Sequence, residues 1–166
     1  MRKWLAVWLL AVAGLLGLSA CDQKKIAELE EGVATEADVR ARFGEPAAVY
    51  ADENGARTFD YPRQPEGQVN YMITIGADGK MSSLRQVLKD TSFAKVQPGM
   101  DKTQLRRLLG RPAKTQLYEL KQEEVWDWRF RDNQENKLFS VTLDKNGVVR
   151  SCATALDPRT SMPGGS

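Results

Sequence analysis

The sequence has no histidine and only two cysteines among its 166 residues. Histidine is the commonest general base of enzymes and a common metal ligand, so its absence removes both roles from the candidate chemistry. The sequence also has no Ser-centred elbow, no phosphate-binding or dinucleotide-binding glycine turn, and no cysteine spacing typical of zinc sites. These absences predict a protein that is not an enzyme and that holds no metal ion.

Acidic residues are the remaining candidates for acid–base or metal chemistry. Glu123, Glu124 and Asp127 could form a carboxylate pair, but neighbours in a strand point to opposite faces, which favours solvated surface residues. Asp144 and Asn146 resemble the start of a calcium loop, yet no later glutamate completes it. A hairpin turn is therefore the expected structure there.

The one long apolar run lies at the start of the chain. Two basic residues precede a 15-residue apolar run from Trp4 to Leu18, and small residues then precede Cys21. Roughly 20 apolar residues are needed to span a bilayer, so the run is too short for a membrane helix. It fits the layout of an export signal, and we expect residues 1–20 to be removed.

The cysteine that follows the signal predicts a lipid anchor. Leu18-Ser19-Ala20-Cys21 resembles the bacterial lipobox, in which the cysteine after the cut becomes the lipidated N-terminus. We expect a covalent lipid on Cys21 as the only cofactor, and two or three acyl chains hold a protein firmly to a membrane. An ordinary signal peptide with a coincidental cysteine is the alternative. Cys152 then has no intramolecular partner, and its strand-like surroundings predict a small buried residue.

Removal of the signal leaves a neutral chain. The whole sequence has 24 Lys and Arg against 22 Asp and Glu, and the signal carries two of the cations and no acid, so the mature chain has 22 of each. A neutral chain has no electrostatic reason to bind nucleic acid, and no such partner is expected.

An internal repeat decides the expected architecture. Residues 35–46 align with residues 101–112 at an offset of 66, and residues 59–61 align with residues 126–128 at an offset of 67. Offsets that grow slowly along the chain, because extra residues are inserted in loops, are typical of a duplicated unit. The paired glycines and prolines of the motif are Gly32 with Gly99, Gly44 with Gly110, and Pro46 with Pro112.

Each copy shows the same order of predicted elements. Thr35 and Asp101 are good N-caps for helices over 35–43 and 101–109, which should end at the following glycine with positive φ. Shorter helices are expected before them, at about 24–31 and 92–96. The predicted strands cover residues 57–61, 68–75 and 80–88 in the first copy and 124–130, 137–143 and 148–155 in the second.

The expected fold is therefore α+β, with two tandem units that each have two short helices followed by a three-stranded antiparallel sheet. Outward strand faces, with Met72, Thr74, Ser140 and Thr142, are the candidate contact surfaces. The expected organisation is a signal peptide at 1–20, a lipidated cysteine and linker at 21–25, repeats at 26–90 and 91–156, and a disordered tail at 157–166.

A family resemblance rests on the second copy. Val96-Gln97-Pro98-Gly99-Met100, Leu105 and Leu109-Gly110-Arg111-Pro112 resemble the SmpA/OmlA family of BamE-like small envelope lipoproteins. The resemblance covers residues 92–156 well and residues 26–88 more loosely. It implies a non-enzymatic scaffold in outer-membrane and envelope maintenance, with the β-barrel assembly machinery as protein partner.

Two alternatives remain open. The tandem also resembles the secreted β-lactamase inhibitor proteins, which implies a binding module that clasps a periplasmic enzyme or a cell-wall component. The BamE-like resemblance implies the periplasmic face of the outer membrane, whereas Asp22 after the lipidated cysteine resembles a signal for retention at the inner membrane.

Overall fold

The chain, seen in a computed structural model, is described over residues 17–160, with side chains from residue 22 onward. Residues 1–16 of the expected signal and residues 161–166 of the expected tail lie outside this range. Two four-stranded antiparallel sheets and few helices confirm the α+β class. The first sheet contains β1 (Ala48–Ala51), β2 (Arg57–Pro62), β3 (Asn70–Ile75) and β4 (Met81–Gln86), and the second contains β5 (Lys114–Tyr118), β6 (Glu123–Asp132), β7 (Glu135–Leu143) and β8 (Val149–Leu156).

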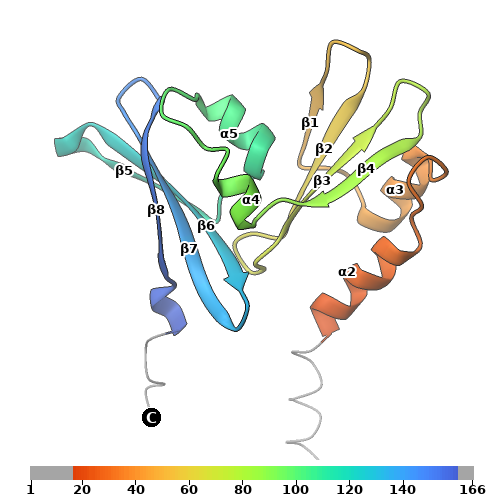
Figure 1. Cartoon of the computed structure of the whole chain (residues 1–166), viewed down its shortest axis with the longest axis horizontal. Helices are drawn as coiled ribbons and strands as arrows, with labels where there is room; N and C mark the ends of the chain where they lie inside the picture. Colours follow the sequence, from red (N-terminus) through yellow and green to blue (C-terminus); the bar gives the residue numbers. More distant parts are fainter. Residues whose placement is uncertain (1–16, 161–166) are drawn as a thin grey trace, which may run out of the picture.

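Helices and sheets alternate in layers. Figure 1 shows α2 (Gly17–Ala27) and α3 (Glu36–Phe43) on one side of the first sheet, and α4 (Asp90–Phe93) and α5 (Lys102–Leu109) between the first sheet and the second. The first sheet is thus covered by helices on both faces and the second on one face. Over residues 17–160, no helix combines the length and the apolar character needed to cross a bilayer.

Two apolar clusters hold these layers together. One packs α3 and the chain before it against the first sheet, around Val39, Phe59 and Ile73. The other packs α4 and α5 against the second sheet, and it also takes in Met72, Val87 and Leu88 from the first expected unit. Because these three side chains cross the expected boundary at residue 90, the two halves share a core.

Both longer helices begin at a reciprocal capping box. The hydroxyl of Thr35 accepts the backbone N–H of Asp38, and the carboxylate of Asp38 accepts the backbone N–H of Thr35 at 2.9 Å. Asp101 and Gln104 make the same pair of hydrogen bonds at 2.8 and 2.9 Å. These bonds satisfy N–H groups that have no partner inside the helix, and they confirm both predicted caps.

Replacement of either cap by alanine should lower the free energy of unfolding by about 1 kcal/mol, because one N–H group of the first turn loses its acceptor. Urea unfolding of Thr35→Ala and Asp101→Ala measures this loss. Thr115→Ala is a control, since Thr115 is exposed in β5 and makes no side-chain hydrogen bond within the described residues. A Thr35→Ala loss no larger than that of the control would contradict the assignment.

An aromatic side chain closes the end of the longer helix in each half. Gly44 and Gly110 have φ of 80° and 75°, as predicted, and each ends its helix. The hydroxyl of Tyr61 donates to the carbonyl of Gly44 at 2.9 Å, and the indole N–H of Trp128 donates to the carbonyl of Gly110 at 3.1 Å. The strand and the helix end are therefore joined in the same way twice.

Each sheet has one strand more than the sequence pattern predicted. β1 and β5 follow Pro46 and Pro112 and pair only with β2 and β6, so both are edge strands. β5 has no buried residue, and β1 alternates between half-buried and exposed residues. An edge strand covered on one side needs no continuous apolar face, which is why the three-strand prediction was wrong.

The expected linker at 21–25 is part of helix α2 instead. Asp22 is 14% exposed in its side chain and accepts two hydrogen bonds from the guanidinium of Arg63, at 2.9 and 3.2 Å. The helix ends at Ala27, before the expected end near residue 31, and Leu29 reaches the core from the turn that follows. The body of the protein therefore begins directly after Cys21.

The first residues of the expected tail are also structured. Asp157 is buried and pairs with Arg129 at 2.7 Å, and a short 3-10 helix, η2 (Pro158–Thr160), follows it. The sequence suggested disorder because the segment lacks apolar periodicity. An ion pair, which leaves no periodic pattern, holds these residues to the second sheet.

Candidate functional site

The outward face of the first sheet is not a free contact surface. Met72 is only 2% exposed because α4 and α5 cover it. Thr74 is half-buried, and its hydroxyl is 3.1 Å from that of Thr58. The prediction that Met72 is an outward contact residue is therefore wrong, since the next unit of the chain covers the face on which it lies.

Ser140 and Thr142 lie on the outer face of the second sheet. Both are half-exposed, and Ser140 donates to the carboxylate of Asp127 at 2.6 Å. In Figure 1 no described helix lies on that side of the sheet.

The acidic candidates are held apart by separate partners. Glu123 pairs with Arg150 at 2.8 Å. Glu124 pairs with Lys102 and accepts the indole N–H of Trp126 at 2.6 Å. Burial tends to raise the pKa of Glu124, but the hydrogen bonds from Lys102 and Trp126 outweigh it and hold the pKa below its ordinary value.

Asp144 shapes a hairpin turn, as expected. Its carboxylate accepts the backbone N–H groups of Asn146 at 2.8 Å and Val148 at 3.0 Å. The hydrogen bond from Val148 is the main reason why the pKa of Asp144 lies below its ordinary value. No group of three potential metal-ligating side chains occurs in residues 17–160.

The repeated glycines and prolines of the sequence motif have structural positions. Gly32 donates its N–H to the carbonyl of Met81, and Gly99 donates to the carbonyl of Val149, at 2.8 and 2.9 Å. Pro46 and Pro112 lie between a helix end and the edge strand that follows. These residues shape the turns and the helix ends of the fold.

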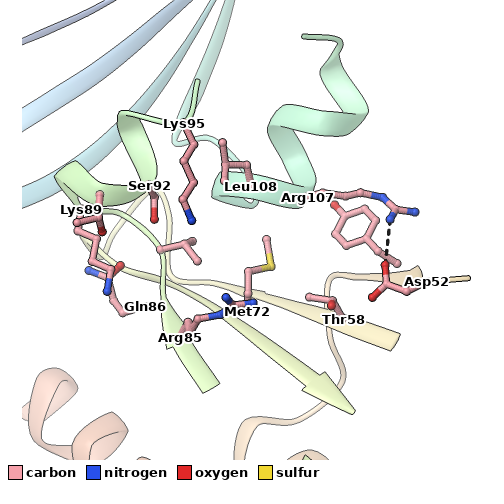
Figure 2. A pocket seen from close by; sticks show the side chains of 13 residues that line it. Asp52, Thr58, Met72, Arg85, Gln86, Lys89, Ser92, Lys95, Arg107 and Leu108 are labelled. Carbon is pink, nitrogen blue, oxygen red and sulfur yellow. Dashed lines mark hydrogen bonds and ion pairs between the residues drawn. The ribbon is translucent and has the colours of Figure 1, made fainter. Parts of the chain in front are cut away.

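A cleft of about 310 Å³ lies between the first sheet and the helices α4 and α5 (Figure 2). Its floor is apolar and its rim carries charged and hydroxyl groups. The lining residues are Tyr50, Asp52, Thr58, Met72, Arg85, Gln86, Val87, Lys89, Thr91, Ser92, Lys95, Arg107 and Leu108.

The cleft has an excess of positive charge. Four cationic side chains and one carboxylate line it. The carboxylate belongs to Asp52 and pairs with Arg107 at 3.3 Å. Arg85, Lys89 and Lys95 form no ion pair with any residue that the structure describes. These three uncompensated cations make this cleft the candidate binding site.

No pattern in the sequence indicates this cleft. Arg85 lies in β4, Lys89 precedes α4, and Lys95 follows it. These cations share no motif or helical spacing. The stacking of the two halves brings them together, and only the switch from strand to helix near residue 89 hints that the segment crosses between layers.

A buried polar junction lies between the two halves. The amide of Asn70, on β3, donates to the carbonyls of Leu109 at 2.8 Å and Arg111 at 2.9 Å. Gly110 lies between these two residues. A β-carbon at Gly110 would be 2.7 Å from the carboxylate of Asp60 and 3.0 Å from the amide of Asn70. Glycine is therefore required here both by its φ and by the close approach of the first sheet.

Asp60 is fully buried at this junction, and neither of its carboxylate oxygens has a hydrogen-bond partner among the residues that the structure describes. Burial raises its pKa to about 6. The charges of Arg106 and Arg111 and the nearby backbone N–H of Arg111, which falls short of hydrogen-bond geometry, offset part of that rise. The ionised carboxylate thus destabilises the fold at neutral pH.

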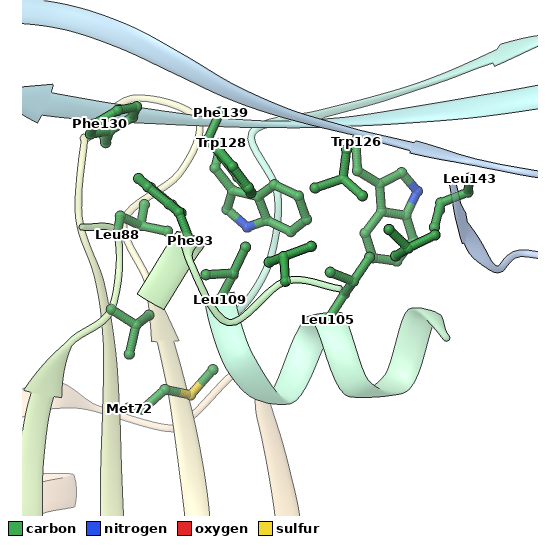
Figure 3. Close-up of a cluster of buried hydrophobic side chains, with 14 residues drawn as sticks. Met72, Leu88, Phe93, Leu105, Leu109, Trp126, Trp128, Phe130, Phe139 and Leu143 are labelled. Atoms are coloured by element: carbon green, nitrogen blue, oxygen red, sulfur yellow. The ribbon is translucent and has the colours of Figure 1, made fainter. Parts of the chain in front are cut away.

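The apolar cluster beside the junction fixes α5 against both sheets. In Figure 3, Leu105 and Leu109 point from α5 toward Trp126 and Trp128, while Met72 approaches from the first sheet. Trp128 is completely buried. The helix that forms one wall of the cleft is therefore held by packing on both of its sides.

A loop of the first half also holds the second sheet. The side-chain amide of Gln64 donates to the carbonyl of Arg129 at 2.7 Å and accepts the backbone N–H of Arg129 at 3.2 Å. The guanidinium of Arg129 donates to the carbonyl of Pro65 at 3.2 Å. These bonds fix the relative position of the two sheets and hence the width of the cleft.

The two cysteines lie in different settings. Cys152 is a free, exposed cysteine in β8, so the prediction of a buried residue is wrong. β8 is an edge strand in which every residue after Val149 is exposed. The backbone of Cys21 belongs to α2, and its side chain lies outside what the structure describes.

Part of the chain matches a known protein family. The model of the outer membrane protein assembly factor BamE domain matches residues 86–153. The matched stretch takes in α4, α5 and the second sheet up to β8. That stretch of the chain is thus similar to a BamE domain, and residues 1–85 lie outside the match. No curated protein matches the chain.

Several solved structures are similar to the chain. A protein described as the osmotically inducible lipoprotein OsmE is 21% identical over 42% of this chain and 82% of its own, with a TM-score of 0.37. The DUF4309 family protein YjgB of Bacillus subtilis subsp. subtilis strain 168 is 18% identical, with coverage of 78% and 83% and a TM-score of 0.31. A candidate β-lactamase inhibitor protein of Streptococcus mutans is 10% identical, with coverage of 83% and 97% and a TM-score of 0.35.

Proposed function

We propose that this chain is a non-enzymatic lipoprotein of the bacterial envelope that assists the assembly of outer-membrane proteins. The observation that carries the proposal is the match of residues 86–153 to the domain of an outer membrane protein assembly factor. The site geometry supports a binding role, because the cleft gathers three cations that form no ion pair with any residue that the structure describes.

The proposal includes a duplication, in which the first half of the chain is a diverged copy of the unit that forms the second half. Each sheet follows the same strand order, and each has a bulge at the same place, after Thr74 in β3 and after Thr142 in β7. The cap residues Thr35 and Asp101 form isolated bridges with Lys80 and Val148. A duplication explains these shared details more simply than chance does.

A lipid on Cys21 is the proposed anchor, and the outer membrane is the proposed location. Because α2 continues from Cys21 into the body and Asp22 is bound by Arg63, the anchor connects to the protein without a flexible linker. The body should therefore lie close to the membrane in one orientation. Retention at the inner membrane is the alternative, and fractionation of the two membranes separates the two locations.

Cys21→Ser should abolish lipid labelling, since serine has no thiol to acylate. Metabolic labelling with a radioactive fatty acid, followed by membrane fractionation, measures the effect. Cys152→Ser is the matched control and should remain fully labelled, because Cys152 lies in a strand of the folded body. Undiminished labelling of Cys21→Ser would contradict the anchor.

Crosslinking and affinity capture of the lipidated protein from its own envelope tests the proposed partner. Recovery of subunits of the β-barrel assembly machinery is the expected result. Recovery of a single soluble periplasmic enzyme, whose activity the pure protein suppresses, would contradict the proposal and establish the inhibitor alternative.

A further inference from the structure

We propose that the cleft between the first sheet and α4 binds an acidic, extended peptide segment of a protein partner. This inference rests on the proposed function in that the partner is another envelope protein, and it names the chemistry by which the partner is recognised. The cations Arg85, Lys89 and Lys95, above an apolar floor, carry the inference.

The cations are available to a ligand. Arg85, Lys89 and Lys95 are exposed and unpaired within the described residues, and the carboxylate of Asp52 is already paired with Arg107. In Figure 2 the ammonium group of Lys95 and the hydroxyl of Ser92 point into the same space, and Arg85 lies across from them on β4. A carboxylate placed there would gain charge-assisted hydrogen bonds with no internal ion pair to break.

The apolar part of the cleft favours a peptide over a small anion. Leu108 and Tyr50 are partly buried and offer apolar surface to a ligand, whereas Met72 and Val87 behind them are buried. The guanidinium of Arg107 lies 5.4 Å from the ring centre of Tyr50. A free phosphate or acetate would leave this surface bare. An extended segment alternates its side chains, so acidic groups can meet the rim while an aliphatic side chain covers the floor.

The position of the cleft favours a protein ligand over a lipid head group. Asp52, which lines the cleft, follows β1 in the turn at the top of Figure 1, whereas α2 begins at the lower end of the molecule. An anchor at Cys21 places the lower end at the bilayer. The end of the cleft at Asp52 therefore faces away from the membrane surface and toward other envelope proteins.

Fluorescence anisotropy with a defined peptide tests the inference. The probe is a fluorescein-labelled hexapeptide of alternating Glu and Leu, titrated with the mature lipidated protein in non-ionic detergent. Arg85→Glu with Lys95→Glu should weaken binding by at least tenfold, because two attractive contacts become repulsive. A peptide with Gln in place of Glu should bind at least tenfold more weakly to the wild-type protein.

Arg131→Glu with Lys114→Glu is the matched control, with the same change of charge at two exposed cations of the second sheet that form no ion pair within residues 17–160. It should leave the affinity within twofold of wild type. Equal losses in both double variants, or no binding to the acidic peptide, would overturn the proposal.

Glycerol 3-phosphate, the soluble head group of an anionic phospholipid, distinguishes the other class of ligand. Glycerol 3-phosphate should fail to displace the peptide when the ionic strength is held constant. Displacement that depends on Arg85 and Lys95, with no preference for the acidic peptide, would overturn the peptide proposal in favour of lipid. Capture of the assembly machinery tests the proposed function separately, since a failed peptide titration leaves that result unaffected.

Discussion

Gly110→Ala is expected to lower the free energy of unfolding by about 3 kcal/mol or more. A residue with a β-carbon costs about 1 kcal/mol at a φ of 75°. The added carbon would also lie 2.7 Å from the carboxylate of Asp60 and 3.0 Å from the amide of Asn70, so these two side chains must shift. That shift weakens the two hydrogen bonds that the buried Asn70 donates, and each unsatisfied group costs about 1–3 kcal/mol. Urea unfolding measures the change.

Gly44→Ala is the matched control at the equivalent position of the first half. Its φ is 80°, but nothing lies within 4 Å of the added β-carbon. It should therefore cost only about 1 kcal/mol, the backbone contribution alone. Equal costs for the two substitutions would show that the close packing of the halves around Gly110 contributes nothing to stability.

Asp60→Asn is expected to stabilise the protein at neutral pH by about 2 kcal/mol. The folded-state pKa of Asp60 is raised to about 6 from an ordinary 3.8, so the folded protein holds this proton more tightly than the unfolded chain does. Its contribution to stability is fully present below pH 3.8 and is lost as the pH rises through 6. Asparagine carries no charge and removes the penalty of burying the carboxylate.

The pH dependence follows from the same shift. Between pH 7.5 and pH 5 the free energy of unfolding of the wild-type protein should rise by about 1.4 kcal/mol from Asp60 alone. The lowered pKa values of Glu36, Asp38, Glu124 and Asp144 oppose this rise only at lower pH, where those carboxylates gain protons.

Urea unfolding at the two pH values measures the dependence. Asp60→Asn should remove the rise, whereas Asp127→Asn, a half-exposed aspartate of the second sheet bonded to Ser140, should retain it. Two results together would contradict the assignment of a buried unpaired carboxylate. The wild-type protein would be no more stable at pH 5 than at pH 7.5, and Asp60→Asn would be as stable as the wild type.

Local signals predicted the elements that local physics determines. Thr35 and Asp101 cap their helices because cap geometry depends on residues three positions apart. Gly44 and Gly110 end those helices with positive φ because other residues are strained there. The edge strands β1 and β5 were missed because pairing on one side demands little of their side chains.

The sequence did not allow a prediction of which elements cover each face of the two sheets. Alternation showed that Met72 and Thr74 share a face of β3. It could not show that α4 and α5 cover this face, while the edge position of β8 leaves Cys152 exposed. The cationic cleft arises from the same stacking, so its residues carried no signal in any single element.

The proposed role in outer-membrane protein assembly is tested most directly by the amount of folded β-barrel protein in cells that lack this chain. Heat-modifiable mobility of an abundant β-barrel protein on gels measures its folded fraction. We expect that fraction to fall, to recover with the wild-type chain and to remain low with Cys21→Ser. A folded fraction that does not change when the chain is absent would contradict the proposed role.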